Sequence, residues 1–249
     1  MKIKIKDIEF IIKKIFFSQS YLLKKRLIRA INNNYEKELT IIDRFSDKSK
    51  NALDIGVYRG VYSLKLSQNF NQIHAFEPNP LLFPYLNTNL KKIIKNINLY
   101  NLALSNNSGE TELKLPVRTK SIFKENIEEL YQLGAASIHP KNEFENFKKV
   151  QVKVEKLDNI SINNIGFIKI DVEGHELEVI EGAKNTITKD KPILLVEIEK
   201  RHSKRSVEET ILKINNLKYE CFFVKDNELI PVEKLNNKNL ENNFFFLPK

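Results

Sequence analysis

Two short apolar segments of this chain each contain or end in an aspartate that is followed within three residues by a glycine. In the first, Leu53, Asp54, Ile55 and Gly56 follow one another; in the second, Gly166 to Asp171 leads to Gly174. A helical pattern follows each segment, as in the β-α units of a parallel sheet. Open parallel sheets bind ligands at the carboxyl ends of their strands. The two aspartates therefore predict a ligand site at one sheet edge.

Strand and helix patterns alternate from residue 51 to the end of the chain. Strands are predicted at 51–55, 73–77, 97–104, 166–171, 192–198, 219–224 and 243–247, and helices near 60–69, 80–95, 175–188 and 205–216. Pro84 interrupts the second helix early, so we expect its regular part after that residue. Right-handed connections of this kind predict an α/β fold, with a mostly parallel seven-stranded sheet and helices on both faces.

The chain divides into an N-terminal helical extension, 1–48, and a main domain, 49–249, with an irregular insertion at about 116–150. A long insertion of this kind is typical of a functional lid. In the extension, apolar residues recur at helical spacing over 3–36 among many lysines and arginines. Such a helix can touch an anionic membrane surface. The favoured interpretation is a helix pair that packs on the main domain and exposes a solvated basic face.

The composition narrows the class of protein. The net charge of +9 invites a nucleic-acid partner, but lysine greatly outnumbers arginine, the residue preferred for phosphate and base recognition. A nucleic-acid partner is therefore not favoured. Cys221 is the single cysteine, so no internal disulfide forms, and no apolar run is long enough for a membrane span. We expect a soluble cytoplasmic protein.

The glycine turn after the first strand favours a cofactor with hydroxyls and a positive charge. Gly56 and Gly60 are spaced G-x-x-x-G, whereas a dinucleotide pyrophosphate needs G-x-G-x-x-G. Asp54, directly before this turn, would repel phosphate and attract a sulfonium or ammonium. Glu77 ends the next strand and can accept hydrogen bonds from two ribose hydroxyls. Alternatively, Asp54 and Glu77 only cap a helix and a loop; together they favour an S-adenosylmethionine site.

From about 51 to 199 the sequence resembles the FkbM-type methyltransferases, which use S-adenosylmethionine and act mostly in O-methylation. The resemblance lies in Ala75-Phe-Glu-Pro-Asn-Pro80, Asn101-Leu-Ala-Leu-Ser105, Gly134-Ala-Ala-Ser-Ile138 and Phe167-Ile-Lys-Ile-Asp-Val-Glu-Gly-His-Glu176. It departs at Tyr58, where the family commonly has asparagine. The resemblance implies that the cofactor is held by Asp54, Gly56, Tyr58, Gly60, Glu77, Pro78, Asn79 and Asp171. Asn101 to Leu104, Ala103 included, should then line the adenine.

Methyl transfer needs an aligned acceptor and removal of its proton. Asp171 should lie beside the methyl donor, with Glu173 close by. His175 is the leading candidate for the general base, because a helix N-terminus favours neutral imidazole. It can instead be a first-turn residue without a chemical role. His202 is the second candidate.

The acceptor is expected between the lid and the fifth strand. Small residues in Gly134–Ile138 allow close approach to a ligand, so Ala135, Ala136, Ser137, Glu197 and His202 are the candidate acceptor contacts. Asp171, Glu173 and Glu197 can together hold Mg²⁺. Alternatively, these carboxylates only interact with a helix start or a loop.

We expect an O-methyltransferase for a hydroxyl of a sugar or related metabolite, in the biosynthesis of polysaccharide, capsule or lipopolysaccharide. The setting follows from the family resemblance alone. The alternatives are methylation of an amine, a phosphate-type oxygen or a nucleic acid, and a non-catalytic module that only binds the cofactor.

Overall fold

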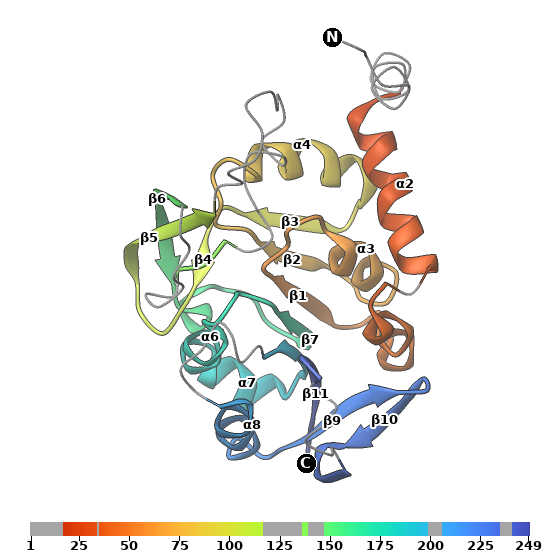
Figure 1. The fold of residues 1–249 in the computed structure, drawn as a ribbon, viewed down its shortest axis with the longest axis vertical. Coiled ribbons are helices and arrows are strands. Elements are labelled where there is room, and N and C mark those ends of the chain that lie inside the picture. Colours follow the sequence, from red (N-terminus) through yellow and green to blue (C-terminus); the bar gives the residue numbers. More distant parts are fainter. Residues whose placement is uncertain (1–16, 34, 117–135, 139–146, 199–205, 235–240) are drawn as a thin grey trace.

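The computed structural model describes residues 17–33, 35–116, 136–138, 147–198, 206–234 and 241–249 (Figure 1). Residue 135, residue 202, most of the insertion and the first sixteen residues lie outside these ranges.

The main sheet has eight strands in the order β10-β9-β11-β8-β7-β1-β2-β3. Their bounds are β1 Asn51–Ile55, β2 Ile73–Phe76, β3 Ile97–Tyr100, β7 Ile165–Ile170, β8 Ile193–Glu197, β9 Tyr219–Lys225, β10 Glu228–Pro231 and β11 Asn243–Pro248. The run from β8 to β3 is parallel, whereas β11 is antiparallel to both β8 and β9. The mostly parallel α/β fold is confirmed.

The expected strand count of seven was wrong by one. The additional strand, β10, forms a hairpin with β9. Asp226 and Asn227, which connect the two strands, both have positive φ. Asp and Asn tolerate this conformation in the two-residue turns of β-hairpins. This turn chemistry is visible in the sequence and was overlooked.

A second sheet of three strands, in the order β4-β6-β5, flanks the main one. It consists of β4 Ala103–Leu104, β5 Gly109–Pro116 and β6 Phe147–Glu155. The single strand predicted at 97–104 is therefore two strands. Its first half pairs with β2, and its second half pairs with β6. The chain leaves the main sheet after Tyr100, so residues 102–104 lie beside the sheet edge.

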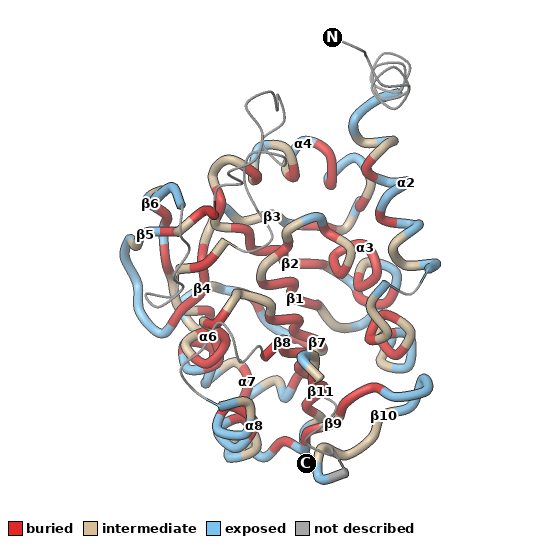
Figure 2. The backbone as a smooth tube through the Cα atoms, viewed as in Figure 1, coloured by how far each residue is buried: buried red, intermediate tan, exposed pale blue. Residues whose placement is uncertain are grey.

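Helices cover both faces of the main sheet, as predicted. The helices are α2 Gln19–Asn32, α3 Val61–Ser67, α4 Phe83–Ile93, α6 Glu176–Gly182, α7 Lys184–Asp190 and α8 Val207–Asn215. Short 3-10 helices span Lys37–Thr40, Ile42–Phe45, Leu157–Asn159 and Val232–Lys234. Alternate strand residues enter two separate cores: Ala52 and Phe167 pack with α2, α3 and α4, whereas Leu53 and Ile168 pack with α6, α7 and α8. The buried sheet between them is seen in Figure 2.

Two helix predictions need correction. Pro84 lies inside the first turn of α4, not ahead of it. The first turn tolerates proline because its N–H groups have no partner within the helix. The helix predicted at 175–188 is two helices that meet at Gly182 and Ala183. There the backbone of Ser105 approaches so closely that a Cβ on Gly182 would lie 1.8 Å from its carbonyl oxygen.

The described part of the N-terminal extension packs on the main domain. Leu23 and Leu27 of α2, with Ile41 and Ile42, belong to the same core as α3 and α4. Arg44 also donates hydrogen bonds to Asn227 and Glu228 at the β9–β10 turn.

Candidate functional site

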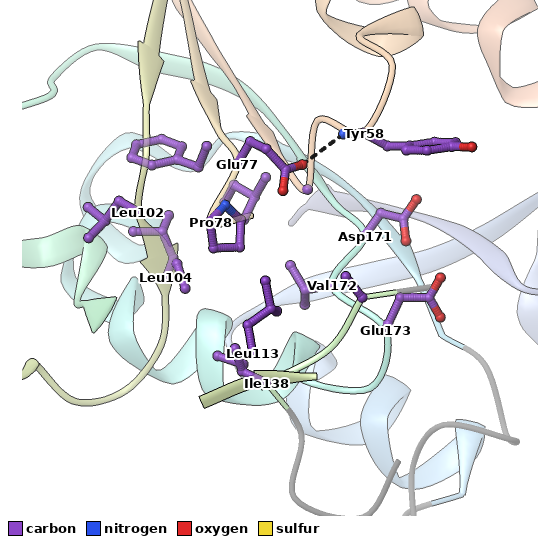
Figure 3. Close-up of a pocket in the computed structure, with 15 residues that line it drawn as sticks. Tyr58, Glu77, Pro78, Leu102, Leu104, Leu113, Ile138, Asp171, Val172 and Glu173 are labelled. Carbon is purple, nitrogen blue, oxygen red and sulfur yellow. Dashed lines mark hydrogen bonds between the residues drawn. The ribbon is translucent and has the colours of Figure 1, made fainter. Parts of the chain in front are cut away.

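An open cavity lies at the carboxyl ends of β1, β2 and β7, beside β4 and β5, and contains about 650 Å³ of empty space with the solvent at its mouth included (Figure 3). Its lining residues are Ile55, Gly56, Tyr58, Phe76, Glu77, Pro78, Leu102, Ala103, Leu104, Leu113, Ala136, Ile138, Asp171, Val172 and Glu173. One side of the cavity is apolar, and the other carries the carboxylates of Glu77, Asp171 and Glu173. An apolar lining with a few convergent polar groups is typical of a small-molecule site.

Glu77 is the buried carboxylate of this cavity. Its Oε2 accepts a hydrogen bond from the Tyr58 N–H at 3.1 Å, and its Oε1 accepts one from the Asn79 N–H at 2.9 Å. Burial raises the pKa of Glu77 to about 7, against the lowering effect of these two backbone donors. Each carboxylate oxygen has a second lone pair, so Glu77 can also accept two ligand hydroxyls. The Asn101 amide donates to the carbonyls of Glu77 and Pro78 and so holds this turn in place.

The turn after β1 passes close to β7. Gly56 has a φ of +90°, and a Cβ there would lie 1.8 Å from the carbonyl oxygen of Asp171. Gly60 also has positive φ, and a Cβ there would meet the Leu90 side chain. Both glycines of the G-x-x-x-G spacing therefore have a physical reason: each has positive φ, and a Cβ at either position would clash with a neighbouring segment. The Tyr58 ring stacks under the Arg59 guanidinium at 4.8 Å.

Asp54 does not line the cavity. Its carboxylate is buried between β1 and α3, where it accepts a hydrogen bond from the Ser63 hydroxyl. Burial raises its pKa to about 7. Asp54 therefore supports the glycine turn from behind, and its direct contact with a cofactor stays a prediction.

Asp171 and Glu173 extend their carboxylates to the same side of the cavity (Figure 3). The Asp171 N–H donates a hydrogen bond to the Ile55 carbonyl, and this bond joins the carboxyl ends of β1 and β7. Glu173 has a φ of +54°, and its carbonyl accepts a hydrogen bond from the Ser137 hydroxyl at 2.7 Å. The strand that carries Asp54 and the strand that leads to Asp171 are thus joined by the backbone hydrogen bond of Asp171, while Asp171 and Glu173 share the cavity wall.

The described part of the predicted lid lies against the apolar wall. Ala136 and Ile138 line the cavity with Leu102 and Leu113, and Ser137 exchanges two backbone hydrogen bonds with Lys114 of β5. Ala136 and Ile138 pack against the small core of Leu113, Leu115 and Val152, so this part of the lid lies on the apolar wall.

His175 is not on the cavity wall. Its Nε2 lies 2.8 Å from the Ser105 hydroxyl oxygen, and its Nδ1 lies 3.7 Å from a Glu178 carboxylate oxygen. This geometry favours the alternative role, in which His175 joins the start of α6 to the end of β4. Its neighbour Glu176, which was not predicted as a site residue, is buried and accepts a hydrogen bond from the Gly174 N–H at 2.8 Å.

The three carboxylates considered for Mg²⁺ do not meet in one group. Within the described ranges, no cluster of three His, Cys, Asp or Glu side chains has a geometry that could hold a metal ion. Glu197, at the end of β8, and Asp171 instead approach the ammonium of Lys169, at 3.8 and 3.9 Å. Lys169 was overlooked, although a lysine inside an apolar strand is a visible signal.

The sheet, the glycine turn and a carboxylate after the second strand together define an S-adenosylmethionine-dependent methyltransferase domain with a Rossmann-like fold. The family description "Methyltransferase FkbM domain" matches residues 54–221, and the chain belongs to the FkbM methyltransferase family.

The chain is also similar to a curated protein and to a solved structure. The methyltransferase sdnD of Sordaria araneosa is 27% identical over an alignment of 153 residues, and the match covers 52% of this chain and 59% of that protein. The crystal structure of methyltransferase FkbM from Methylobacillus flagellatus KT superposes with a TM-score of 0.51 at 16% identity. That match covers 82% of this chain and 44% of the other, and it supports the fold. The chain thus spans about half the length of these relatives.

Proposed function

We propose that this chain transfers the methyl group of S-adenosylmethionine to a hydroxyl of a sugar or related polyol, in the biosynthesis of a polysaccharide, capsule or lipopolysaccharide. The observation that carries the proposal is the placement of Asp171 and Glu173 on one side of the cavity, at the carboxyl ends of the strands. Carboxylates accept hydrogen bonds and so suit an acceptor rich in hydroxyls. The bound cofactor supplies a methyl group on a cationic sulfur.

Different residues of the cavity bind the cofactor and the acceptor. Glu77 holds the ribose hydroxyls, and the apolar wall at Leu102, Leu104 and Ile138 receives the adenine. Asp171 then orients the acceptor hydroxyl and takes its proton as the new bond forms, while Glu173 binds a neighbouring hydroxyl. Glu197 contributes contacts on the acceptor side, and Ser137 of the lid holds the Glu173 backbone in place. We assign the proton-accepting role to Asp171 in preference to His175, because His175 faces Ser105.

Mass spectrometry of surface glycans, from cells with and without the gene, tests the acceptor. We expect a sugar that carries a methyl ether only when the gene is present. The purified chain should then transfer radiolabelled methyl to that glycan or its precursor, and an Asp171→Asn variant should transfer at least about 100-fold more slowly. Transfer to protein amines or nucleic acid would contradict the proposal. Tight cofactor binding without transfer to any acceptor would favour the non-catalytic alternative.

A stripe on the outer side of α2 supports a second proposal: we infer that the chain contacts the anionic, cytoplasmic side of a membrane. Phe17, Tyr21 and Ile28 are each about two-fifths exposed, at 42%, 41% and 41%. Phe17 and Tyr21 stack, and the Lys25 ammonium lies 5.0 Å above the Tyr21 ring. At 3.6 residues per turn, Tyr21, Lys25 and Ile28 share one side of α2 with exposed Lys24, opposite Leu23. Phe17 precedes the helix and joins this stripe through its stack on Tyr21. No acidic residue interrupts α2, so its charge complements anionic lipids.

Among the described residues, no helix is both long and apolar enough to cross a bilayer, so the contact proposed is peripheral. In sedimentation with vesicles, we expect binding to mixed phosphatidylcholine and phosphatidylglycerol but little binding to pure phosphatidylcholine. Lys24→Glu with Lys25→Glu should weaken binding at least about tenfold, since each lysine near the surface contributes about 1 kcal/mol. Leu212→Ser, on exposed α8, is the matched control. Equal binding to both vesicles, or a dimer that forms through Tyr21, would contradict the proposal.

A further inference from the structure

Lys169 of β7 is a fully buried lysine at the carboxyl edge of the sheet. Its ammonium donates a hydrogen bond to the Asn243 side-chain oxygen at 3.1 Å and lies 4.9 Å from the centre of the Tyr62 ring. The carboxylate oxygens of Glu197 and Asp171 lie at 3.8 and 3.9 Å, within ion-pair distance. A buried lysine is rare unless it is paired.

The sheet topology brings these partners together. Asp171 lies two residues beyond Lys169, at the end of the same strand, and Glu197 ends the neighbouring strand β8. Because β11 is antiparallel to β8, it begins at the edge where β8 ends, and Asn243 pairs directly with Glu197. Three strand ends therefore surround one ammonium group.

The electrostatics keep this lysine charged. Burial lowers the pKa of Lys169. The carboxylates of Asp171 and Glu197, and after them those of Glu36 and Asp54, raise it by more, so the net shift of the pKa is upward. The Asp171 and Glu197 side chains are 34% and 25% exposed, whereas the Lys169 side chain is 1% exposed. A ligand can therefore reach both carboxylates but not the ammonium behind them.

We propose that Lys169 is a positioning residue: it acts as a built-in cation between Asp171 and Glu197, and it sets both the charge and the spacing of the carboxylates beside the methyl donor. Asp171 lines the cofactor cavity and Glu197 lies outside its wall, so Lys169 links a carboxylate of the cavity to the one on which we propose an acceptor contact. With two carboxylates and one ammonium, the group carries a net charge of −1. The inference rests on the proposed placement of the cofactor in the cavity.

The charge can be measured without knowing the acceptor. S-adenosylmethionine carries a positive charge on its sulfur and S-adenosylhomocysteine does not. The ratio of their dissociation constants therefore measures the electrostatic potential at the sulfur position. In calorimetric titrations at about pH 8, Lys169→Met should shift this ratio at least threefold toward S-adenosylmethionine. Glu197→Gln, which leaves Lys169 balanced by Asp171 alone, should shift the ratio at least threefold the other way. The double variant restores the charge of −1 and should return the ratio to within twofold of wild type.

Lys65→Met is the matched control, because Lys65 is also a buried lysine paired with a carboxylate, that of Asp43, and it lies outside the cavity wall. This variant should leave the ratio unchanged. If Lys169→Met fails to fold, folding rescue by Glu197→Gln supports the charge role, and the Glu197→Gln single variant still measures this potential. An unchanged ratio in that single variant would overturn the proposal. Weak binding of both ligands to the wild type would instead remove the proposed cofactor site.

Discussion

Glu77→Gln is expected to weaken S-adenosylhomocysteine binding about 100-fold or more in calorimetric titration. The carboxylate accepts two backbone N–H groups and has lone pairs left for two ribose hydroxyls. Glutamine replaces one acceptor oxygen with an NH₂ donor, so one backbone donor and one ligand hydroxyl lose their partner. Hydrogen bonds to charged groups contribute about 1.5 to 3 kcal/mol each, which makes the combined loss large.

A pH series separates this binding role from a general loss of structure. Because the pKa of Glu77 is raised to about 7 in the empty site, a ligand that needs the ionised form binds less well below that pH. Wild-type affinity should fall about tenfold from pH 8 to pH 6, and Glu77→Gln should flatten this dependence. Asp158→Asn is the matched control, since Asp158 also accepts two backbone N–H groups but lies away from the cavity. Affinity within threefold of wild type in Glu77→Gln would refute the assignment.

Gly56→Ala should lower the free energy of unfolding by about 2 to 4 kcal/mol and abolish cofactor binding. Alanine is strained at a φ of +90°, and its Cβ would lie 1.8 Å from the Asp171 carbonyl oxygen. Overpacking of this kind costs about 1 to 3 kcal/mol in addition to the strain. The neighbouring strands β1 and β7 must separate to relieve it, and this displaces Asp171. Urea denaturation and ligand titration measure the two effects.

Gly109→Ala is the control for backbone strain alone. Gly109 also has positive φ, at +138°, but a Cβ there would meet no atom within 4 Å. We expect a loss of about 1 kcal/mol with unchanged ligand affinity. Equal losses of stability at Gly56 and Gly109 would show that the close approach to Asp171 has no energetic weight.

The acceptor side was harder to predict from sequence than the cofactor side. The glycine turn and Glu77 are encoded within a few residues of two strand ends, and both are on the cavity wall. His175 was chosen for its position near a helix start, but its ring turns to Ser105, seventy residues earlier in the chain. Lys169 stands out in its apolar strand, but its partners do not follow from the sequence, because they come from β8 and β11.

The α/β class and the FkbM motifs can be read from the sequence, since strand ends, glycine turns and helical periodicity are local properties. Three positions depend on tertiary packing: Asp54 lies behind the cavity, Ala136 lies on the apolar wall and Lys169 lies between two carboxylates. The direction of a side chain past the end of a strand depends on which distant segment packs there. Distances between such segments are set by strand order and register, and these arise only when the whole sheet forms.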